Sequence, residues 1–574
     1  MKGIEKIFTN INERLSNGII RIPFAEKWSV PQWLVSLCIY GWFALVVVWF
    51  VADCFFGQVI NTDECYMALC CRDYAQQPIA MLTFYLGWLA IQVFGDQVIT
   101  LRLLMCLCVF VGVGVPCWYC HRRTGSIRWP LFIFTCILIA VRSQYYKFYG
   151  WDLGPIIFAG PLITFIISLY DGLTVKRVVY VGIFAALMIL SRVPSGIIVV
   201  PVCFVSLWVA TKGQKDRNKA YWNNLGIGLV SFTLTAMAVI YLMKGSVSSY
   251  IMSWRPENII TGHGVREAMD FYLKFLKEDF NLIYSEGWIA KYALFSIFLL
   301  LLFSRNSRLL PGAVLLVLLS YQQLVHHGLI NVPHVIFDLA IILLPILYNL
   351  KSLLIGSRER LEIDSRKYWT MILFVFVMVI GSDRLLRRVD LFYMLPIFLV
   401  SAYPVRRGII FWILLFLTFP GWVFSTGYRI QRTAICSPLE NVLPRHKYVY
   451  DEVAATMYVS PLEPVTDLFK REGKRVCTFS QGRYAPSYLY YDGLPYRLNV
   501  FHFYYNKDFI DALDDFAENN DAMILYSKEL PLYSQDELPG MMRERGFYLT
   551  GRPGEFLVYE RIRPRDFITI RDTY

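Results

Sequence analysis

Long apolar runs recur through residues 34–425, and short segments between them carry most of the charges. A helix of about 20 apolar residues crosses the hydrocarbon core of a bilayer and satisfies its own backbone hydrogen bonds. The chain is 56% hydrophobic and only 17% charged, which argues against a soluble protein of this length. We predict a mainly α, polytopic membrane protein with about thirteen spans, near residues 34–56, 98–120, 129–147, 154–170, 178–191, 195–210, 225–243, 289–303, 309–327, 333–350, 368–381, 390–403 and 408–425.

The positions of Lys and Arg give the expected orientation of these spans. Basic residues gather in cytoplasmic loops of membrane proteins, so the net charge of +12 does not indicate a nucleic-acid partner. Placing residues 1–33 in the cytoplasm also puts the basic segments 121–123, 212–219 and 351–367 there. Residues 79–94 are then an interfacial helix, because a further span at this point would invert every later loop. The outer segments are 57–97, 148–153, 192–194, 244–288, 328–332, 382–389 and the C-terminal region.

The C-terminal region, residues 428–574, has a different composition from the spans at 34–427. Charges and turn residues are dense, and no run is long enough to cross a bilayer. Strands are predicted at 474–479, 522–526 and 556–559, with an amphipathic helix at 508–519 and a turn at Gly546-Phe547. This alternation predicts a small extracytoplasmic α/β domain. It carries no glycine-rich phosphate loop, and we interpret it as a lid or an acceptor-recognition module.

Two adjacent carboxylates, Asp63 and Glu64, follow the first span on the outer side. Acidic residues next to a bilayer are costly and are usually retained for function, although a loop returning to solvent is the simpler alternative. The outer segment 57–97 continues with an amphipathic stretch that carries Arg72 and with the interfacial helix. Two such helices form a shelf at the membrane surface, which can hold a lipid phosphate near the carboxylates.

Other charged residues of the outer segments are further candidates. Asp152 precedes a span, where it is either a functional carboxylate or the N-cap of a helix beginning near Gly154. Arg192, between two spans, either points into the cavity or is an interfacial arginine whose charged group reaches water, which is the simpler interpretation. Arg255 follows Trp254 and suits a lipid phosphate or a sugar ring. Arg387 and Arg388, followed by Tyr393, are basic residues in an outer segment, whereas Lys and Arg usually gather on the cytoplasmic side. They indicate either an anionic ligand such as phosphate or ordinary contact with lipid headgroups.

Together these features resemble the GT-C glycosyltransferases, in the branch of the protein O-mannosyltransferases and the lipid A aminoarabinose transferases. The resemblance rests on four motifs, namely the Asp-Glu pair after span one, the interfacial helices ending in Phe94-Gly95 and Leu101-Arg102-Leu103, the Asp of the next outer loop, and the Arg-Arg-x-x-x-x-Tyr-x-Leu-Pro run that begins at Arg387. The resemblance covers residues 1–425 in architecture and implies a GT-C fold.

The resemblance also implies a reaction. It implies an inverting transferase that moves a sugar from a polyprenyl-phosphate donor to an acceptor at the outer face. Asp63 is then the candidate base, Asp152 the second carboxylate, and Glu64 a supporting residue. Arg72, Arg255, Arg387, Arg388 and Tyr393 are the candidates for binding the donor and its phosphate.

Some expectations stay open at the level of sequence. Gln77-Pro78-Ile79-Ala80 stands where many relatives carry His-Pro-Pro-Leu or Lys-Pro-Pro-Leu. We therefore assign no metal ligand, and a divalent metal remains only an alternative cofactor. The sugar and the acceptor, which is a lipid, a glycan or a protein, are not specified. Compact loops and the absence of a retention signal at residues 572–574 favour a bacterial inner membrane, with the C-terminal domain in the periplasm. A transporter or lipid flippase is the alternative function.

Overall fold

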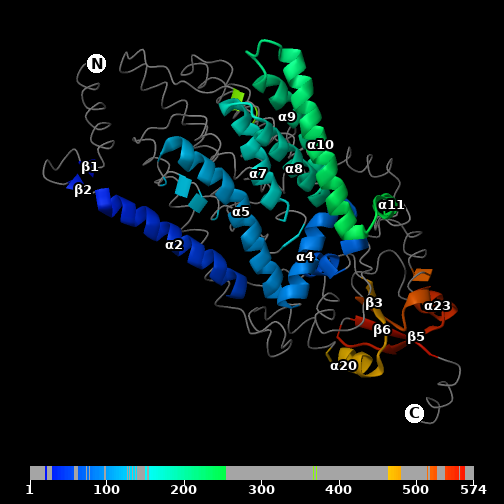
Figure 1. The fold of residues 1–574 in the computed structure, drawn as a ribbon. Helices are drawn as coiled ribbons and strands as arrows, with labels where there is room; N and C mark the ends of the chain where they lie inside the picture. The colour runs from blue at the N-terminus through cyan, green and yellow to red at the C-terminus, as the bar shows by residue number, and fades with distance from the viewer. Residues whose placement is uncertain are drawn as a thin grey trace, which may run out of the picture.

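The structure is a computed structural model with a helical bundle and a small C-terminal sheet (Figure 1). Most of the described chain is helical. The elements described here lie in residues 20–21, 29–30, 32–56, 63–72, 74–76, 78–95, 98–125, 149–150, 154–253, 463–479, 517–526, 537–554 and 556–562, with single positions at 127–138, 366–370 and 513–514.

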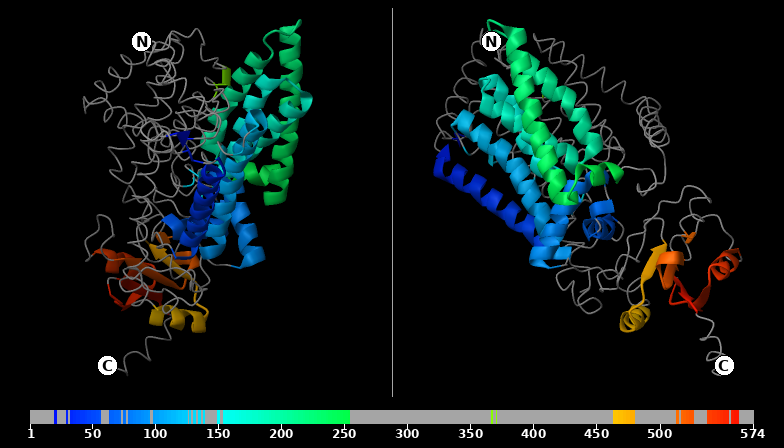
Figure 2. Two further views of the ribbon diagram at one scale, coloured as in Figure 1. Left: turned by 90° about the vertical axis from the view of Figure 1, so that its left-hand side faces the viewer. Right: turned by 45° about the vertical axis from the view of Figure 1, so that its right-hand side comes forward.

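The bundle is built from long apolar helices joined by short segments. In chain order they are α2 (Gln32–Phe56), α3 (Asp63–Arg72), η1 (Tyr74–Gln76), η2 (Pro78–Ala80), α4 (Met81–Phe94), α5 (Val98–Thr124), α7 (Ile156–Ser168), η3 (Leu169–Asp171), α8 (Val175–Ser191), α9 (Val193–Ala210), α10 (Arg217–Lys244) and α11 (Val247–Met252). A two-residue pairing, β1 (Ile20–Arg21) with β2 (Ser29–Val30), precedes them. Helices α5, α7, α8 and α10 lie side by side in both views of Figure 2.

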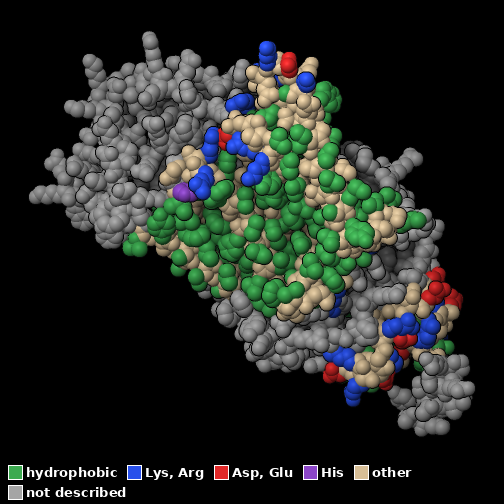
Figure 3. Space-filling model, in the orientation of Figure 1, with side chains coloured by type: hydrophobic (Ala, Val, Ile, Leu, Met, Phe, Trp, Pro, Cys, Tyr) green, Lys and Arg blue, Asp and Glu red, His purple; other side chains and the backbone are tan. Residues whose placement is uncertain are grey.

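Two described helices, within α5 and α10, are long and apolar enough to cross a membrane. Along α10, Val230, Leu234, Tyr241 and Leu242 are each at least 60% exposed. An apolar face of this extent suits contact with lipid. In the view of Figure 3, hydrophobic side chains cover most of the described bundle, and Lys and Arg side chains gather at one end of it. The number of spans and their orientation remain predictions.

The helices were predicted correctly at residues 34–56, 98–120, 154–170, 178–191 and 195–210, within a few residues at each end. The helix predicted from residue 225 begins at Arg217, because polar residues extend it by two turns beyond its apolar part. Helix α4 has 14 residues, so it is about 21 Å long and shorter than the hydrocarbon core. This length agrees with the interfacial prediction. The spans predicted at 289–425 lie outside the described residues.

Close packing of α5 on α7 depends on glycine. A Cβ added at Gly160 would overlap the backbone of Gly112, and one added at Gly112 would overlap Ile156. The same arrangement joins α8 to α10, where a Cβ at Gly182 would overlap Ser231 and the backbone of Gly228. Such small-residue contacts let helix backbones approach closely, which is the usual basis of helix association in lipid.

The C-terminal region contains a four-stranded sheet with helices α20 (Glu463–Glu472) and α23 (Glu537–Glu544). The strands are β3 (Val476–Phe479), β4 (Ala522–Tyr526), β5 (Phe547–Gly551) and β6 (Phe556–Arg561). Their order is β3-β4-β6-β5, with β3 parallel to β4 and the other pairs antiparallel.

This sheet confirms the predicted strands and adds one that was missed. Phe547 was assigned to a turn, but it begins β5 and is buried among Leu525, Met542 and Tyr559. Arg475 and Asp521 join the starts of β3 and β4 through hydrogen bonds of 3.0 to 3.2 Å, and the Arg475 guanidinium lowers the pKa of Asp521. The α/β character is therefore shown for this region, while the domain boundaries stay predictions.

Candidate functional site

Helices α3 and α4 form a compact shelf directly after the first long helix. Met67, Cys70 and Cys71 of α3 are buried. A Cβ added at Gly87 of α4 would overlap the sulfur of Cys71, so the two helices meet with no room between them. Asp63 and Glu64 are the first two residues of α3. The two predicted helices therefore pack against each other, with the carboxylate pair at the first turn of α3, and their position at a membrane surface remains a prediction.

The segment that carries Asp152 rests on this shelf through its neighbours. The Tyr149 hydroxyl is buried and donates a hydrogen bond to the Thr83 carbonyl oxygen of α4 at 2.5 Å. A Cβ at Gly150 would lie 2.7 Å from the Cγ of Met67, and one at Gly154 would lie 2.5 Å from the Cγ2 of Thr83. Residues 149–150 and 154 are thus packed against α3 and α4, on both sides of Asp152.

Asp152 itself lies outside the described residues, so both interpretations of it, the functional carboxylate and the helix cap, stay predictions. Helix α7 begins at Ile156 with Pro155 as its N-cap. Just before the helix, the Gly154 N–H donates to the Gly150 carbonyl at 2.8 Å.

The break between α8 and α9 meets the same part of α4. The Thr83 hydroxyl donates to the Ser191 carbonyl at 2.9 Å. Thr83 therefore links the break to Tyr149 and the Asp152 segment. The next residue, Arg192, has extended backbone and is only 8% exposed. The interpretation of Arg192 as an arginine reaching into water is therefore wrong, since surrounding chain covers the side chain.

The C-terminal end of α10 closes another side of the shelf. Tyr74 of η1 donates to the Met243 carbonyl at 3.2 Å, and the Lys244 ammonium donates to the Ala75 carbonyl at 2.6 Å. Tyr74 also packs against the rings of Tyr85 and Trp88, 5.1 and 5.5 Å away between centroids. Apolar side chains of α4, α8 and α10 continue this contact. Three separate segments thus converge on the part of the chain from α3 to α4: residues 149–150 and 154, the break between α8 and α9, and the end of α10.

Helical geometry places the predicted residues of α3 on different faces. Met67, which contacts Gly150, is four residues after Asp63, so the two occupy the same face of α3. Arg72 is nine residues after Asp63, which corresponds to the opposite face and about 13 Å along the axis. The structure therefore does not bring Arg72 to the face that Asp63 shares with Met67.

The remaining predicted site residues are not placed by the structure. For Asp63 and Glu64 only the backbone is described, and Asp152, Arg255, Arg387, Arg388 and Tyr393 lie outside the described residues. Sequence reasoning missed Thr83 and Tyr149, which connect the segments. Their only sequence signal is a polar group in an apolar context, beside the small residues Gly150 and Gly154.

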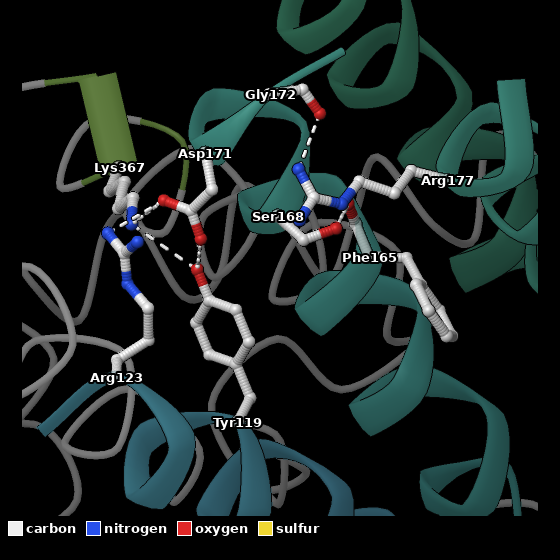
Figure 4. Close-up of polar contacts among 8 residues, drawn as sticks. All are labelled: Tyr119, Arg123, Phe165, Ser168, Asp171, Gly172, Arg177 and Lys367. Carbon is white, nitrogen blue, oxygen red and sulfur yellow. Dashed lines mark hydrogen bonds and ion pairs between the residues drawn. The ribbon is translucent and has the colours of Figure 1, made fainter. Parts of the chain in front are cut away.

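A separate polar cluster lies where α5 and α7 end, and Figure 4 shows it. Asp171 receives hydrogen bonds from Lys367, at 2.7 Å, and from the hydroxyl of Tyr119, and Arg123 pairs with it at 2.7 Å. The Lys367 side chain is 1% exposed and that of Arg123 is 45% exposed, so this is a partly buried ion cluster in which the carboxylate is paired with two cations. It joins the ends of α5 and η3 to residue 367, three segments that the charge pattern assigns to the cytoplasm. We interpret it as structural.

Metal ligands do not cluster in the part of the chain that the structure describes, where no three His, Cys, Asp or Glu side chains come together. No protein-family model matches the sequence, and no curated protein matches it. Among solved structures, ArnT from Cupriavidus metallidurans in the apo state is similar, with a TM-score of 0.42 and 14% identity over 92% of this chain and 98% of that chain.

The structure of ArnT from Cupriavidus metallidurans bound to undecaprenyl phosphate has a TM-score of 0.39, at the same identity and coverage. ArnT is a GT-C lipid A aminoarabinose transferase, the branch that the sequence motifs resemble. A TM-score below 0.5 is too low to transfer an activity. The functional argument therefore rests on the residues and contacts of this chain.

Proposed function

We propose that this protein is an integral-membrane inverting glycosyltransferase that takes its sugar from a polyprenyl phosphate and works at the outer face. One observation carries the proposal. Gly150 packs on Met67, so the segment that bears Asp152 is seated on the helix that begins with Asp63. Two carboxylate-bearing segments separated by over 80 residues thereby meet at one end of the bundle, as a reaction with a base and a positioning group requires.

The reaction follows from the chemistry of the donor. An acceptor hydroxyl or phosphate oxygen attacks C1 of the sugar from the side opposite the lipid phosphate. The new C–O bond forms while the bond from C1 to the phosphate oxygen breaks, so the configuration at C1 inverts. Asp63 accepts the proton of a hydroxyl nucleophile, Asp152 orients the substrate, and Glu64 supports Asp63. The lipid phosphate leaves with the bonding electrons, and its charge must be balanced by cations.

The other parts of the proposal concern segments beyond the described residues. Arg255, Arg387, Arg388 and Tyr393 bind the donor from the later outer loops. The C-terminal α/β region lies in the periplasm of a bacterial inner membrane and covers the site or recognises the acceptor. The acceptor is a lipid, a glycan or a protein.

Transfer from a panel of radiolabelled polyprenyl-phosphate sugars tests the proposal. Membranes containing the wild type, Asp63→Asn or Asp152→Asn would be compared, and label would be followed into lipid, polymer and protein fractions. Loss of a general base typically costs about 10²- to 10⁴-fold in rate, and we expect Asp63→Asn to fall in this range. Asp171→Asn, at the other end of the bundle, is the control and should retain transfer per folded molecule.

Two results would contradict the proposal. Full activity in both the Asp63→Asn and the Asp152→Asn variants would remove the carboxylates from the reaction. Uptake of a solute or lipid into proteoliposomes, with no transfer to any acceptor, would favour the transporter alternative.

A further inference from the structure

Arg192 is a buried cation at the same end of the bundle as the carboxylate segments, and the proposed function as stated gives it no role. We propose that Arg192 binds the phosphate of the polyprenyl-phosphate donor. This inference rests on the proposed function and names a phosphate contact within the described residues. It rests on the location, the burial and the fixed backbone of Arg192.

The location of Arg192 follows from the hydrogen bonds of its neighbours. Ser191 accepts from the Thr83 hydroxyl, and the Thr83 carbonyl accepts from Tyr149. Arg192 follows Ser191 directly, and Asp152 comes three residues after Tyr149. Both therefore lie close in sequence to a residue that bonds to Thr83. Arg192 therefore lies at the junction where α4, the Asp152 segment and the α8–α9 break meet.

The backbone holds Arg192 in one place. Its N–H donates to the Met188 carbonyl at 3.0 Å, and its carbonyl accepts from the Gly196 N–H at 2.8 Å. A Cβ at Gly196 would overlap the backbone of Ile189, so α8 and α9 meet closely just beyond the break. A side chain on such a tight connection begins from a fixed Cα and loses little conformational freedom when it binds a ligand.

The chemistry of a buried guanidinium favours an anion as its ligand. Burying an arginine in a membrane protein is costly, and such residues usually face the bundle interior and mark substrate sites. Guanidinium groups bind phosphate through two parallel hydrogen bonds. Arg72, by contrast, lies on the face of α3 opposite Asp63.

Paired binding measurements with two lipids test this inference. Undecaprenyl phosphate and undecaprenol share the hydrocarbon chain and differ by the phosphate, so the ratio of their Kd values isolates the phosphate contribution. The ratio would be measured in detergent by native mass spectrometry for the wild type, Arg192→Gln, Arg192→Lys and Arg177→Gln. Arg177 is the matched control, because it lies at the opposite end of α8, where it donates to the Gly172 carbonyl.

We expect the wild type and Arg177→Gln to prefer undecaprenyl phosphate, and Arg192→Gln to lose that preference by on the order of tenfold. Arg192→Lys keeps the positive charge but lacks the paired N–H donors of the guanidinium group, so it should lose part of the preference for undecaprenyl phosphate. If Arg192→Gln does not fold, the ratio of Kd values measured for Arg192→Lys tests the inference in its place. A merely structural Arg192 would weaken both lipids equally and leave the ratio unchanged.

The outcomes separate this inference from the function on which it rests. An unchanged ratio in a folded Arg192→Gln protein, or in Arg192→Lys if that is the folded variant, overturns the role of Arg192 alone. A wild type that binds undecaprenyl phosphate no better than undecaprenol overturns both this inference and the proposed donor.

Discussion

At the scale of single residues, Thr83 organises the candidate site. Its hydroxyl donates to the Ser191 carbonyl, and its own carbonyl accepts from the Tyr149 hydroxyl, so one residue of α4 holds two separate segments. Both hydrogen bonds are buried, where an unmade bond leaves a polar group unsatisfied. The Tyr149 hydroxyl therefore anchors the start of the segment that carries Asp152 three residues later.

We expect Tyr149→Phe to lower the rate of transfer about tenfold while the protein remains folded. A buried hydrogen bond contributes about 1 kcal/mol, and small displacements of a reacting group are costly in rate. The reduction should appear mainly in kcat, measured with saturating donor. Tyr170→Phe is the control, because it removes a buried hydroxyl that lies 2.6 Å from the Thr370 hydroxyl at the other end of the bundle. Equal rates in the two variants would show that the hydroxyl does not position Asp152.

The candidate carboxylates were predictable from sequence, but their surroundings were not. Asp63 and Asp152 stand out because charge is rare in this chain near apolar runs. The interpretation of Arg192 as reaching into water failed because the sequence does not show which neighbours cover a side chain. This error concerns a tertiary contact.

At the scale of elements, the bundle is held together by close contacts between helix backbones. Gly112 and Gly160 let α5 and α7 touch, and α7 follows directly from the Asp152 segment. Hydropathy predicted both helices, because a long apolar run has few alternatives in lipid. It could not predict which of the glycines form contacts, since Gly114 lies one half-turn from Gly112 in open space.

Gly112→Ala and Gly114→Ala form a matched pair that tests this packing. A methyl group at residue 112 overlaps the backbone of Ile156, so the helices must separate, and overpacking typically costs about 1–3 kcal/mol. A methyl group at residue 114 meets nothing within 4 Å, and alanine favours a helix over glycine. Thermal unfolding in detergent should therefore show a lower Tm for Gly112→Ala and an equal or higher Tm for Gly114→Ala. The same Tm for both variants would contradict the close contact.

At the scale of the whole molecule, the two ends of the bundle differ in chemistry. One end carries the ion cluster of Asp171, in which the carboxylate is neutralised by Lys367 and Arg123. The other end gathers α3, α4, the Asp152 segment and Arg192. The charge-based topology, including the side of the membrane at which each end lies, remains a prediction. A transferase of this type needs such an asymmetry, because its donor and acceptor meet on one side only.

The stereochemistry and stoichiometry of transfer test the central proposal most directly. Purified protein would be given an undecaprenyl-phosphate sugar and the acceptor identified from the labelled fractions. The anomeric configuration of the product would be read by NMR, and released undecaprenyl phosphate would be quantified. We predict inversion at C1 and one undecaprenyl phosphate released for each sugar transferred. A product with retained configuration, or transfer without release of the lipid phosphate, would contradict the account.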